Sequence, residues 1–294
     1  MRMWRIGPSG ARPSGCAPSV LTLAPGKPRT IAGASPSVSL MKEPSSRLVR
    51  TLTRSREGLG FGSHLAHKLG FHVRPRFAGV SLSAPDDGTA WKVALQIAVG
   101  EYRWPGLTPE AGWRVVDVGA NIGVFSLWAE RLGADVTAFE PEPRTFASLV
   151  TNVAGRRISP TQAALVDQAV PAVRLYLSEM DSTSNTLAGR EIETGEPLRD
   201  FVDVPTVTLT EVVGSGCDLL KLDCEGAEFE ALLGADDDTL RRAQRIILEF
   251  HRIAGSPDAI VERLEAVGME VTRFAETEDV GLLGATTARI ASPR

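Results

Sequence analysis

The stretch that decides the fold is Trp113-Arg-Val-Val-Asp-Val-Gly-Ala-Asn-Ile-Gly-Val-Phe-Ser-Leu-Trp128. It begins with an apolar run, 115–118, which one acidic residue interrupts, and it continues through a glycine turn, 119–123. After the turn, apolar residues recur with the period of an α-helix as far as Gly133. A buried strand that leads through a glycine turn into a helix is typical of nucleotide-binding units. The glycines let a ligand approach the backbone, and the first N–H groups of the helix face that ligand.

The acidic residue in this stretch, Asp117, narrows the class of ligand. A dinucleotide would place its pyrophosphate at the start of the helix, where a nearby carboxylate would repel it. S-Adenosylmethionine carries a sulfonium and an α-ammonium group and has no phosphate, so a carboxylate would attract it. The pattern therefore favours a methyl donor over NAD or ATP, the alternative being a turn that only packs a helix on a sheet. The residues expected to bind the donor here are Asp117, Gly119, Ala120, Asn121 and Gly123.

A second acidic residue follows at the interval expected for a neighbouring strand. Residues 135–139 are predicted to form a buried strand that ends at Glu140-Pro141, and Glu140 lies 23 residues after Asp117. An acid at this strand tip is placed to accept both ribose hydroxyls of a nucleoside, so Glu140 and Pro141 are expected at the donor site. The alternative interpretation is a helix-start acid, because Pro143 suits the first position of a helix.

The rest of the chain alternates predicted strands with predicted helices. The helices are expected at 89–99, 143–153, 226–233 and 257–267, and residues 182–200 are expected to form a loop near the acceptor site. The further strands are expected at 158–162, 172–177, 201–209, 217–223, 245–251, 269–274 and 282–290. This order predicts an α/β fold with a doubly wound, seven-stranded Rossmann-like sheet, a closing antiparallel pair and a small N-terminal helical extension.

Three blocks of sequence resemble the signatures of the FkbM family, and they are Asp117-Val-Gly-Ala-Asn-Ile-Gly123, Ala138-Phe-Glu-Pro141 and Leu220-Lys-Leu-Asp-Cys-Glu-Gly-Ala-Glu228. Proteins of this family are class I S-adenosylmethionine-dependent methyltransferases that most often act on hydroxyl oxygens. The resemblance runs from Trp113 to His251, and the order of its blocks is specific for the family but not for the acceptor. It implies that S-adenosylmethionine is the cofactor and that Gln162 and Ala163, after the third strand, contact the adenine.

The same resemblance divides the chain into three parts. Residues 1–46 are rich in Pro, Ser and Arg and are predicted to be disordered, with Met41 as an alternative start. Residues 47–110 are expected to form an N-terminal helical segment, which in this family would cover the cofactor cleft as a lid. Residues 111–294 are expected to form the methyltransferase domain.

Catalytic groups are expected where the fourth and fifth strands end, because ligands bind at the carboxyl ends of parallel strands. Methyl transfer to a hydroxyl requires an aligned acceptor and removal of the hydroxyl proton. We expect His251 to be the general base, because an unperturbed imidazole is neutral near pH 7, with Asp223 or Glu225 orienting it. Lys221 shares a strand face with Asp223, and a purely structural ion pair of Lys221 with Asp223 or with Glu225 is the alternative.

Composition excludes several classes of function. The first 42 residues hold six of the 32 basic residues and none of the 36 acidic ones, so the remainder carries a net charge of −10. This acidity argues against nucleic acid as a partner. No apolar run approaches the ~20 residues of a membrane span, so no membrane partner is predicted. Three cysteines form neither a disulfide framework nor a metal motif, which favours the cytoplasm.

The leading interpretation is O-methylation of a hydroxyl on a small molecule or glycan, by a protein that can also form a homodimer. An N-methyltransferase for protein or RNA commonly has an Asn/Asp-Pro-Pro-Tyr turn after the fourth strand, where this chain has Asp223-Cys-Glu-Gly226. A non-catalytic S-adenosylmethionine-binding scaffold is the other alternative, and the intact acidic residues argue against it. The acidic cluster would also suit a Mg²⁺-like ion, but the family signature does not require one and no metal site is predicted.

Overall fold

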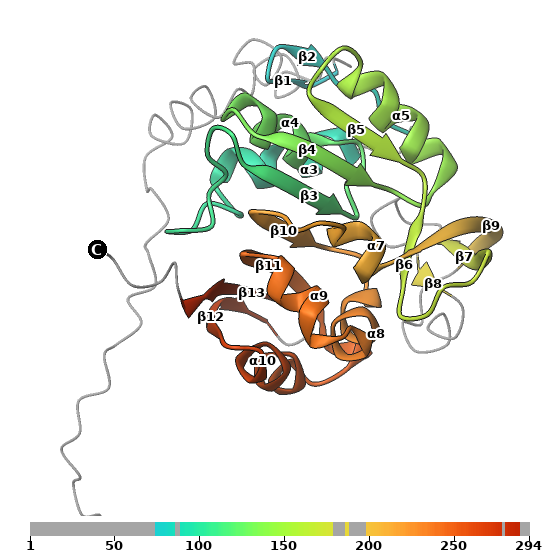
Figure 1. Cartoon of the computed structure of the whole chain (residues 1–294). Coiled ribbons are helices and arrows are strands. Elements are labelled where there is room, and N and C mark those ends of the chain that lie inside the picture. Colours follow the sequence, from blue (N-terminus) through green and yellow to red (C-terminus); the bar gives the residue numbers. More distant parts are fainter. Residues whose placement is uncertain (1–73, 86–88, 179–185, 188–197, 278–279, 289–294) are drawn as a thin grey trace, which may run out of the picture. The chain divides into compact units, whose positions relative to one another are not determined.

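The computed structural model describes residues 74–85, 89–178, 186–187, 198–277 and 280–288. Its main sheet has seven strands in the order β12-β13-β11-β10-β3-β4-β5 (Figure 1). The strands are β3 (Arg114–Val118), β4 (Asp135–Phe139), β5 (Ile158–Thr161), β10 (Leu219–Leu222), β11 (Arg245–His251), β12 (Met269–Glu276) and β13 (Val280–Thr287). The five strands from β5 to β11 are parallel, whereas β13 joins β11 in the antiparallel sense. The predicted fold class is confirmed.

Alternate side chains of the central strands enter two hydrophobic clusters, one on each face of the sheet. On β3, Val115 belongs to one cluster and Val116 to the other, and on β10 Leu219 and Leu220 divide in the same way. Burial on both faces explains why these strands appear in the sequence as continuous apolar runs. The same period of two places Asp117 on the face of Val115, a placement that matters for the site.

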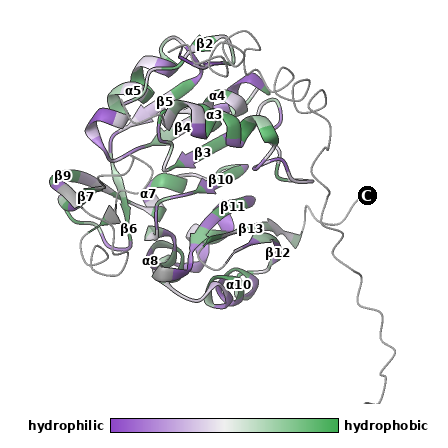
Figure 2. Cartoon of the chain, turned by 180° about the vertical axis from the view of Figure 1, so that it is seen from behind, coloured by the Kyte–Doolittle hydropathy of each residue, from purple (hydrophilic) through white to green (hydrophobic). Residues whose placement is uncertain are grey.

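Three helices contribute to the cluster on the Val115 face, namely α3 (Thr89–Val99), α4 (Val124–Arg131) and α5 (Pro143–Val153). Four contribute to the opposite cluster, namely α7 (Leu209–Val213), α8 (Ala227–Gly234), α9 (Asp237–Arg242) and α10 (Pro257–Ala266). The predicted start of α10 is confirmed, because the Ser256 hydroxyl accepts a hydrogen bond from the backbone N–H of Asp258. Figure 2 shows α10 in both green and purple, as expected for a helix with one apolar face.

A second sheet of four strands, in the order β6-β9-β7-β8, was not predicted as a unit. Its strands are β6 (Ala164–Val166), β7 (Ala172–Ser178), β8 (Thr186–Leu187) and β9 (Leu198–Thr208). The predicted loop over 182–200 is therefore partly wrong, because 186–187 and 198–200 belong to strands, and its other residues lie outside the described part. Strands of two or three residues, such as β6 and β8, are too short to show a periodic pattern.

The described residues before β3 form a β-hairpin and then α3. The hairpin joins β1 (Arg76–Phe77) to β2 (Val80–Ser81), and Phe77 is fully buried in the cluster that α3 also enters. The predicted helix at 89–99 is confirmed by α3. The disorder predicted for 1–46 lies outside the described residues, as does the part before residue 74 of the helical segment predicted for 47–110. In its described part that prediction is wrong for 76–81, which form the hairpin, because strands of two residues give no periodic pattern. None of the helices in the described ranges is long and apolar enough to cross a membrane.

Gly119 marks the closest approach of two strand ends. It follows β3 with a φ of +73°, and a Cβ built there would lie 1.7 Å from the backbone oxygen of Asp223, just after β10. A side chain at this position would therefore push the ends of β3 and β10 apart. Only glycine fits both the space and the left-handed backbone.

We therefore predict that Gly119→Ala lowers the free energy of unfolding by at least about 3 kcal/mol, because it adds a backbone clash to a strained φ. Gly112→Ala is the matched control, since Gly112 has a φ of +82° and no atom within 4 Å of its built Cβ. That variant should lose only about 1–2 kcal/mol, the cost of the left-handed conformation. Urea denaturation measures both values, and equal losses would contradict the proposed clash.

Candidate active site

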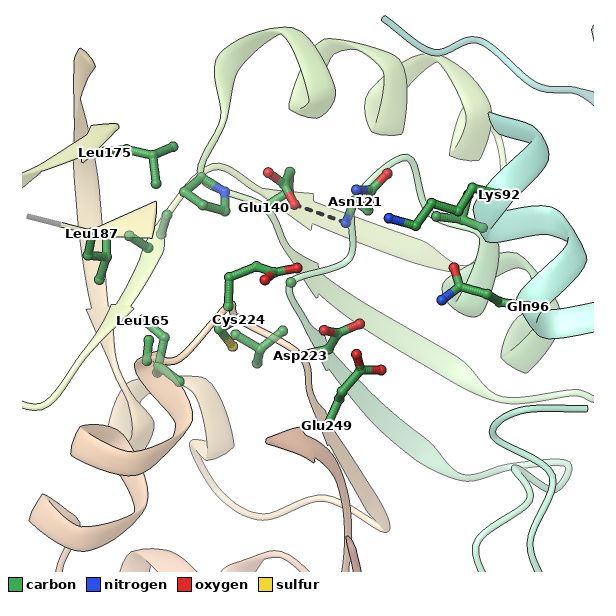
Figure 3. A pocket seen from close by; sticks show the side chains of 18 residues that line it. Lys92, Gln96, Asn121, Glu140, Leu165, Leu175, Leu187, Asp223, Cys224 and Glu249 are labelled. Atoms are coloured by element: carbon green, nitrogen blue, oxygen red, sulfur yellow. Dashed lines mark hydrogen bonds between the residues drawn. The ribbon is translucent and has the colours of Figure 1, made fainter. Parts of the chain in front are cut away.

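A pocket opens at the carboxyl ends of the parallel strands (Figure 3). One end has an apolar wall of Leu165, Leu175 and Leu187, all from the second sheet. The opposite end is lined by Lys92 and Gln96 of α3. Asp223, just after β10, and Glu249 of β11 lie side by side. The predicted site residues that line the pocket are Gly119, Asn121, Glu140, Pro141, Ala163, Asp223 and Glu225.

The remaining predicted residues lie around the pocket rather than in its wall. Ala120 lines a smaller adjoining pocket, and Gln162 donates a hydrogen bond from Nε2 to the backbone oxygen of Pro141 at 3.2 Å. Gly123 has a φ of +88°, and a Cβ there would lie 2.6 Å from Leu149 of α5, so it packs the turn. Asp117 and His251 do not line either pocket.

Glu140 joins the end of β4 to the glycine turn. Its Oε2 accepts a hydrogen bond from the backbone N–H of Asn121 at 2.9 Å, and its Oε1 accepts one from that of Glu142 at 3.0 Å. The residue is only 7% exposed, yet it lines the pocket. Burial raises its pKa to about 7, although the two backbone hydrogen bonds act in the opposite direction. Glu140 therefore presents to the pocket a carboxyl group that titrates near neutral pH.

Asp117 does not reach the pocket, so the direct donor contact expected for it is not supported. It is fully buried on the Val115 face, where its Oδ2 accepts a 2.6 Å hydrogen bond from Ser126 of α4. Its Oδ1 lies 3.3 Å from Nζ of Lys221. Because side chains alternate between the two faces of β3, this carboxylate points into the core beneath the glycine turn. There it pairs with Lys221 and does not contact a ligand in the pocket.

Lys221 holds the ends of β3 and β10 together. Its Nζ donates a hydrogen bond to the backbone oxygen of Gly119 at 2.8 Å and lies 3.3 Å from Oδ2 of Asp223. Burial would lower the pKa of Lys221, but the carboxylates of Asp223 and Asp117 outweigh burial and raise it. The ion pair considered from the sequence is present, and it includes the second partner Asp117. The lysine is thus charged, although only 3% of it is exposed.

Tyr102 and Glu249 complete the polar group around Asp223. Tyr102 lies between α3 and β3, and its hydroxyl is 3.1 Å from Oδ2 of Asp223 and 3.3 Å from Oε2 of Glu249. Burial, together with the charges of Asp223 and Glu101, raises the pKa of Glu249 to about 8. Sequence reasoning missed Tyr102, because its position in a short turn gives no periodic signal.

His251 is placed between carboxylates. Its Nε2 lies 3.2 Å from Oε2 of Glu225 and 4.0 Å from Oε1 of Glu249, and its Nδ1 lies 3.8 Å from the fully buried Glu228. Burial lowers the pKa of His251, but Glu228 and Glu225 outweigh burial and raise it to about 10. The expectation of an imidazole that is neutral near pH 7 is therefore wrong, because the sequence did not show how many acids surround it.

Glu225, which His251 contacts, has an unusual backbone conformation. Its φ is +51°, a left-handed value that is uncommon outside glycine and asparagine. Burial raises its pKa to about 8, and it lines the pocket. His251 thus connects the buried Glu228 to a pocket carboxylate. Within the described residues, no group of three His, Cys, Asp or Glu side chains is arranged to hold a metal ion.

Comparisons with known proteins find similarity to methyltransferases. The model of the methyltransferase FkbM domain matches residues 117–271. The chain is 30% identical over 219 residues to the 31-O-demethyl-FK506 methyltransferase FkbM of Streptomyces tacrolimicus, covering 60% of this chain and 82% of that protein. It is 29% identical over 192 residues to the methyltransferase sdnD of Sordaria araneosa, covering 54% of this chain and 74% of that protein. A solved TehB-like SAM-dependent methyltransferase from Corynebacterium glutamicum matches with 13% identity and a TM-score of 0.40, covering 68% of this chain and 96% of that one.

The titrating groups at β10 and β11 predict how stability depends on pH. Glu249 has a folded-state pKa of about 8, above its ordinary 4.5, so its stabilising contribution is complete below pH 4.5 and lost as the pH rises through 8. His251, raised from 6.5 to about 10, contributes stability that is complete below pH 6.5 and lost as the pH rises through 10. The melting temperature should therefore fall between pH 6 and pH 10.

Glu249→Gln removes one of these ionisations and should weaken the fall. At pH 9 we expect this variant to melt about 2–4 °C above the unsubstituted protein, the effect of about 1 kcal/mol in a domain of this size. Glu270→Gln, on an exposed position of β12, is the control and should follow the unsubstituted curve. Thermal scans monitored by circular dichroism test this, and a melting temperature that is constant from pH 6 to pH 9 would contradict it.

Proposed function

The chain belongs to the FkbM methyltransferase family, and we propose that it uses S-adenosylmethionine to methylate a hydroxyl oxygen of a small molecule or glycan. The observation that carries the proposal is the buried Glu140 carboxyl in the wall of a pocket that also has an apolar end. A carboxylate at this strand tip is suited to accept hydrogen bonds from a ribose diol. The three leucines of the second sheet supply apolar surface for an adenine ring.

The charges of the pocket support a donor that is cationic and free of phosphate. The acidic residues Glu140, Asp223, Glu225 and Glu249 line it, against one basic residue, Lys92, among the lining residues of the described chain. Glu225 and Glu249, whose pKa values are raised to about 8, are largely protonated at pH 7. The Asp223 carboxylate, which is paired with Lys221, and the ionised fraction of Glu140 would therefore repel a pyrophosphate and attract a sulfonium or an ammonium group. When bound, S-adenosylmethionine supplies a methyl group whose bond to the positively charged sulfur breaks as the acceptor oxygen bonds to its carbon.

The chain itself has to align the acceptor and take its proton. Asp223 is the group we assign to proton removal, because it lines the pocket and its Oδ2 is held 3.3 Å from Nζ of Lys221. His251 does not line the pocket and is a cation at neutral pH, so its role in this proposal is to hold Glu225. The Streptomyces tacrolimicus relative is a methyltransferase for an O-demethyl compound, which supports oxygen as the methylated atom.

The donor role of Glu140 is tested by Glu140→Ala. We expect this variant to bind S-adenosylhomocysteine roughly 10- to 100-fold more weakly, because hydrogen bonds to a charged acceptor contribute about 1.5–3 kcal/mol each. Asp135→Ala, at the exposed opposite end of the same strand, is the matched control and should bind normally. Isothermal titration calorimetry measures both affinities. Unchanged affinity in a folded Glu140→Ala protein would remove Glu140 from the ribose role.

The affinity should also depend on pH with a definite sign. Below its pKa of about 7, Glu140 is protonated and accepts less well from two hydroxyls, so binding should weaken as the pH falls. Between pH 8 and pH 6 the expected loss is roughly tenfold, which follows from the ionised fraction of a group that titrates at 7. Glu140→Gln should abolish this dependence. Turnover of the donor with candidate hydroxyl acceptors then separates an enzyme from a binding scaffold.

A further inference from the structure

Tyr102 lies outside the residues matched by the family model, 117–271, and its hydroxyl contacts the acidic end of the pocket. It is 5% exposed, and its ring packs edge-on against Phe125 of α4 with centroids 5.4 Å apart. Trp104, two residues later, stacks on Phe274 of β12 with ring centroids 4.0 Å apart. Its indole Nε1 donates a hydrogen bond to the backbone oxygen of Glu101. These contacts fix where the phenol hydroxyl points.

The hydroxyl of Tyr102 reaches two carboxyl groups at once. It lies 3.1 Å from Asp223 and 3.3 Å from Glu249, yet a phenol has only one proton to donate. If both carboxyl groups were ionised, one of the two short contacts would join two lone pairs in a partly buried site, which is unfavourable. Both contacts become hydrogen bonds when one carboxyl is protonated and donates to the phenol oxygen, while the phenol donates to the other.

The neighbouring charges decide which carboxyl is ionised. Nζ of Lys221 lies 3.3 Å from Asp223, whereas the nearest cation to Glu249 is His251 at 4.0 Å. Lys221 gives Asp223 an ion-pair partner, whereas burial and the charge of Asp223 raise the pKa of Glu249 and keep the proton there. The other titratable groups that face this unit are Asp117 from β3, Glu101 from the turn after α3, Glu225 and Glu228 after β10, and His251 of β11.

We propose that Tyr102 is a positioning residue that holds Asp223 and Glu249 around a single shared proton. The unit then carries one negative charge, located on Asp223, and a neutral carboxyl on Glu249. This inference rests on the proposed function, in which Asp223 accepts the proton of the acceptor hydroxyl. Tyr102 sets both the direction and the charge of that carboxylate without itself lying in the wall of the main pocket.

The chain offers a direct test, because it contains only two tyrosines, Tyr102 and Tyr176. In full-length protein labelled with ¹³Cζ-tyrosine, two resonances are expected, and Tyr176→Phe identifies the one from Tyr102. That resonance should shift as the pH is raised, with a midpoint near 8, where Glu249 loses its proton. The shift should vanish in Glu249→Gln. A Tyr102 resonance that does not move, or that moves equally in Glu249→Gln, overturns the proposal.

Tyr102→Phe provides a second readout that a purely structural tyrosine would not change. It keeps the ring beside Phe125 and removes only the hydroxyl. The shared-proton state has one more hydrogen bond than the fully ionised state. Its loss should therefore lower the folded-state pKa of Glu249, so the part of the fall in melting temperature that Glu249→Gln removes should end about one pH unit lower. Lower melting temperatures at every pH, with that end point unmoved, would show a packing role only and overturn the proposal, and Tyr176→Phe is the matched control.

Both readouts need neither donor nor acceptor, so their failure is distinct from that of the proposed function. If the unsubstituted protein does not bind S-adenosylhomocysteine, the proposed function fails whatever the tyrosine resonance does. If the protein binds it but the resonance is independent of Glu249, only the shared proton fails. Should Tyr102→Phe not fold, the resonance of the unsubstituted protein and of Glu249→Gln still decides the question.

Discussion

The buried ammonium of Lys221 is the interaction on which the site depends. It contacts the carboxylate of Asp117 beneath the glycine turn, the carbonyl of Gly119 within it, and the carboxylate of Asp223 at the pocket. Leaving one buried charge without its partner is strongly unfavourable, so these groups must stay together in the folded state. The absence of a Cβ at Gly119 allows that closeness. One cation thereby couples the position of the turn to the position of the proposed proton acceptor.

Much of the architecture was predictable because it depends on patterns that are local in the sequence. The strands buried on both faces appear as apolar runs, and α5 and α10 carry start signals at Glu142-Pro143 and Ser256-Pro257. The spacing of Glu140 after the glycine turn correctly placed it at the tip of the adjacent strand, within hydrogen-bonding distance of Asn121. Such features can be predicted from the spacing of apolar residues and from the residues at helix starts and turns, and both are visible in a single sequence.

The errors concern properties that depend on distant residues. The side chain of Asp117 was placed on the wrong side of the turn, since the face of a buried strand cannot be read where both neighbours are apolar. The ionisation of His251 is set by Glu225 and Glu228, which reach it from a different element. Tyr102 meets its partners across 121 and 147 residues of sequence. Contacts between residues so far apart in the sequence depend on the order of the strands in the sheet. The local pattern of residues does not reveal them.

The second sheet has a consequence for how the protein responds to its ligand. Among the described residues, its own core has three buried side chains, Ala164, Leu175 and Val204. Leu165, Leu175 and Leu187 face the pocket, so a flat ligand seated against them would act as an additional layer of that core. Ligand binding and local unfolding of this sheet are then thermodynamically linked. The sheet would be the region whose amide hydrogen exchange slows most on binding, and the pocket would be partly assembled by the molecule that fills it.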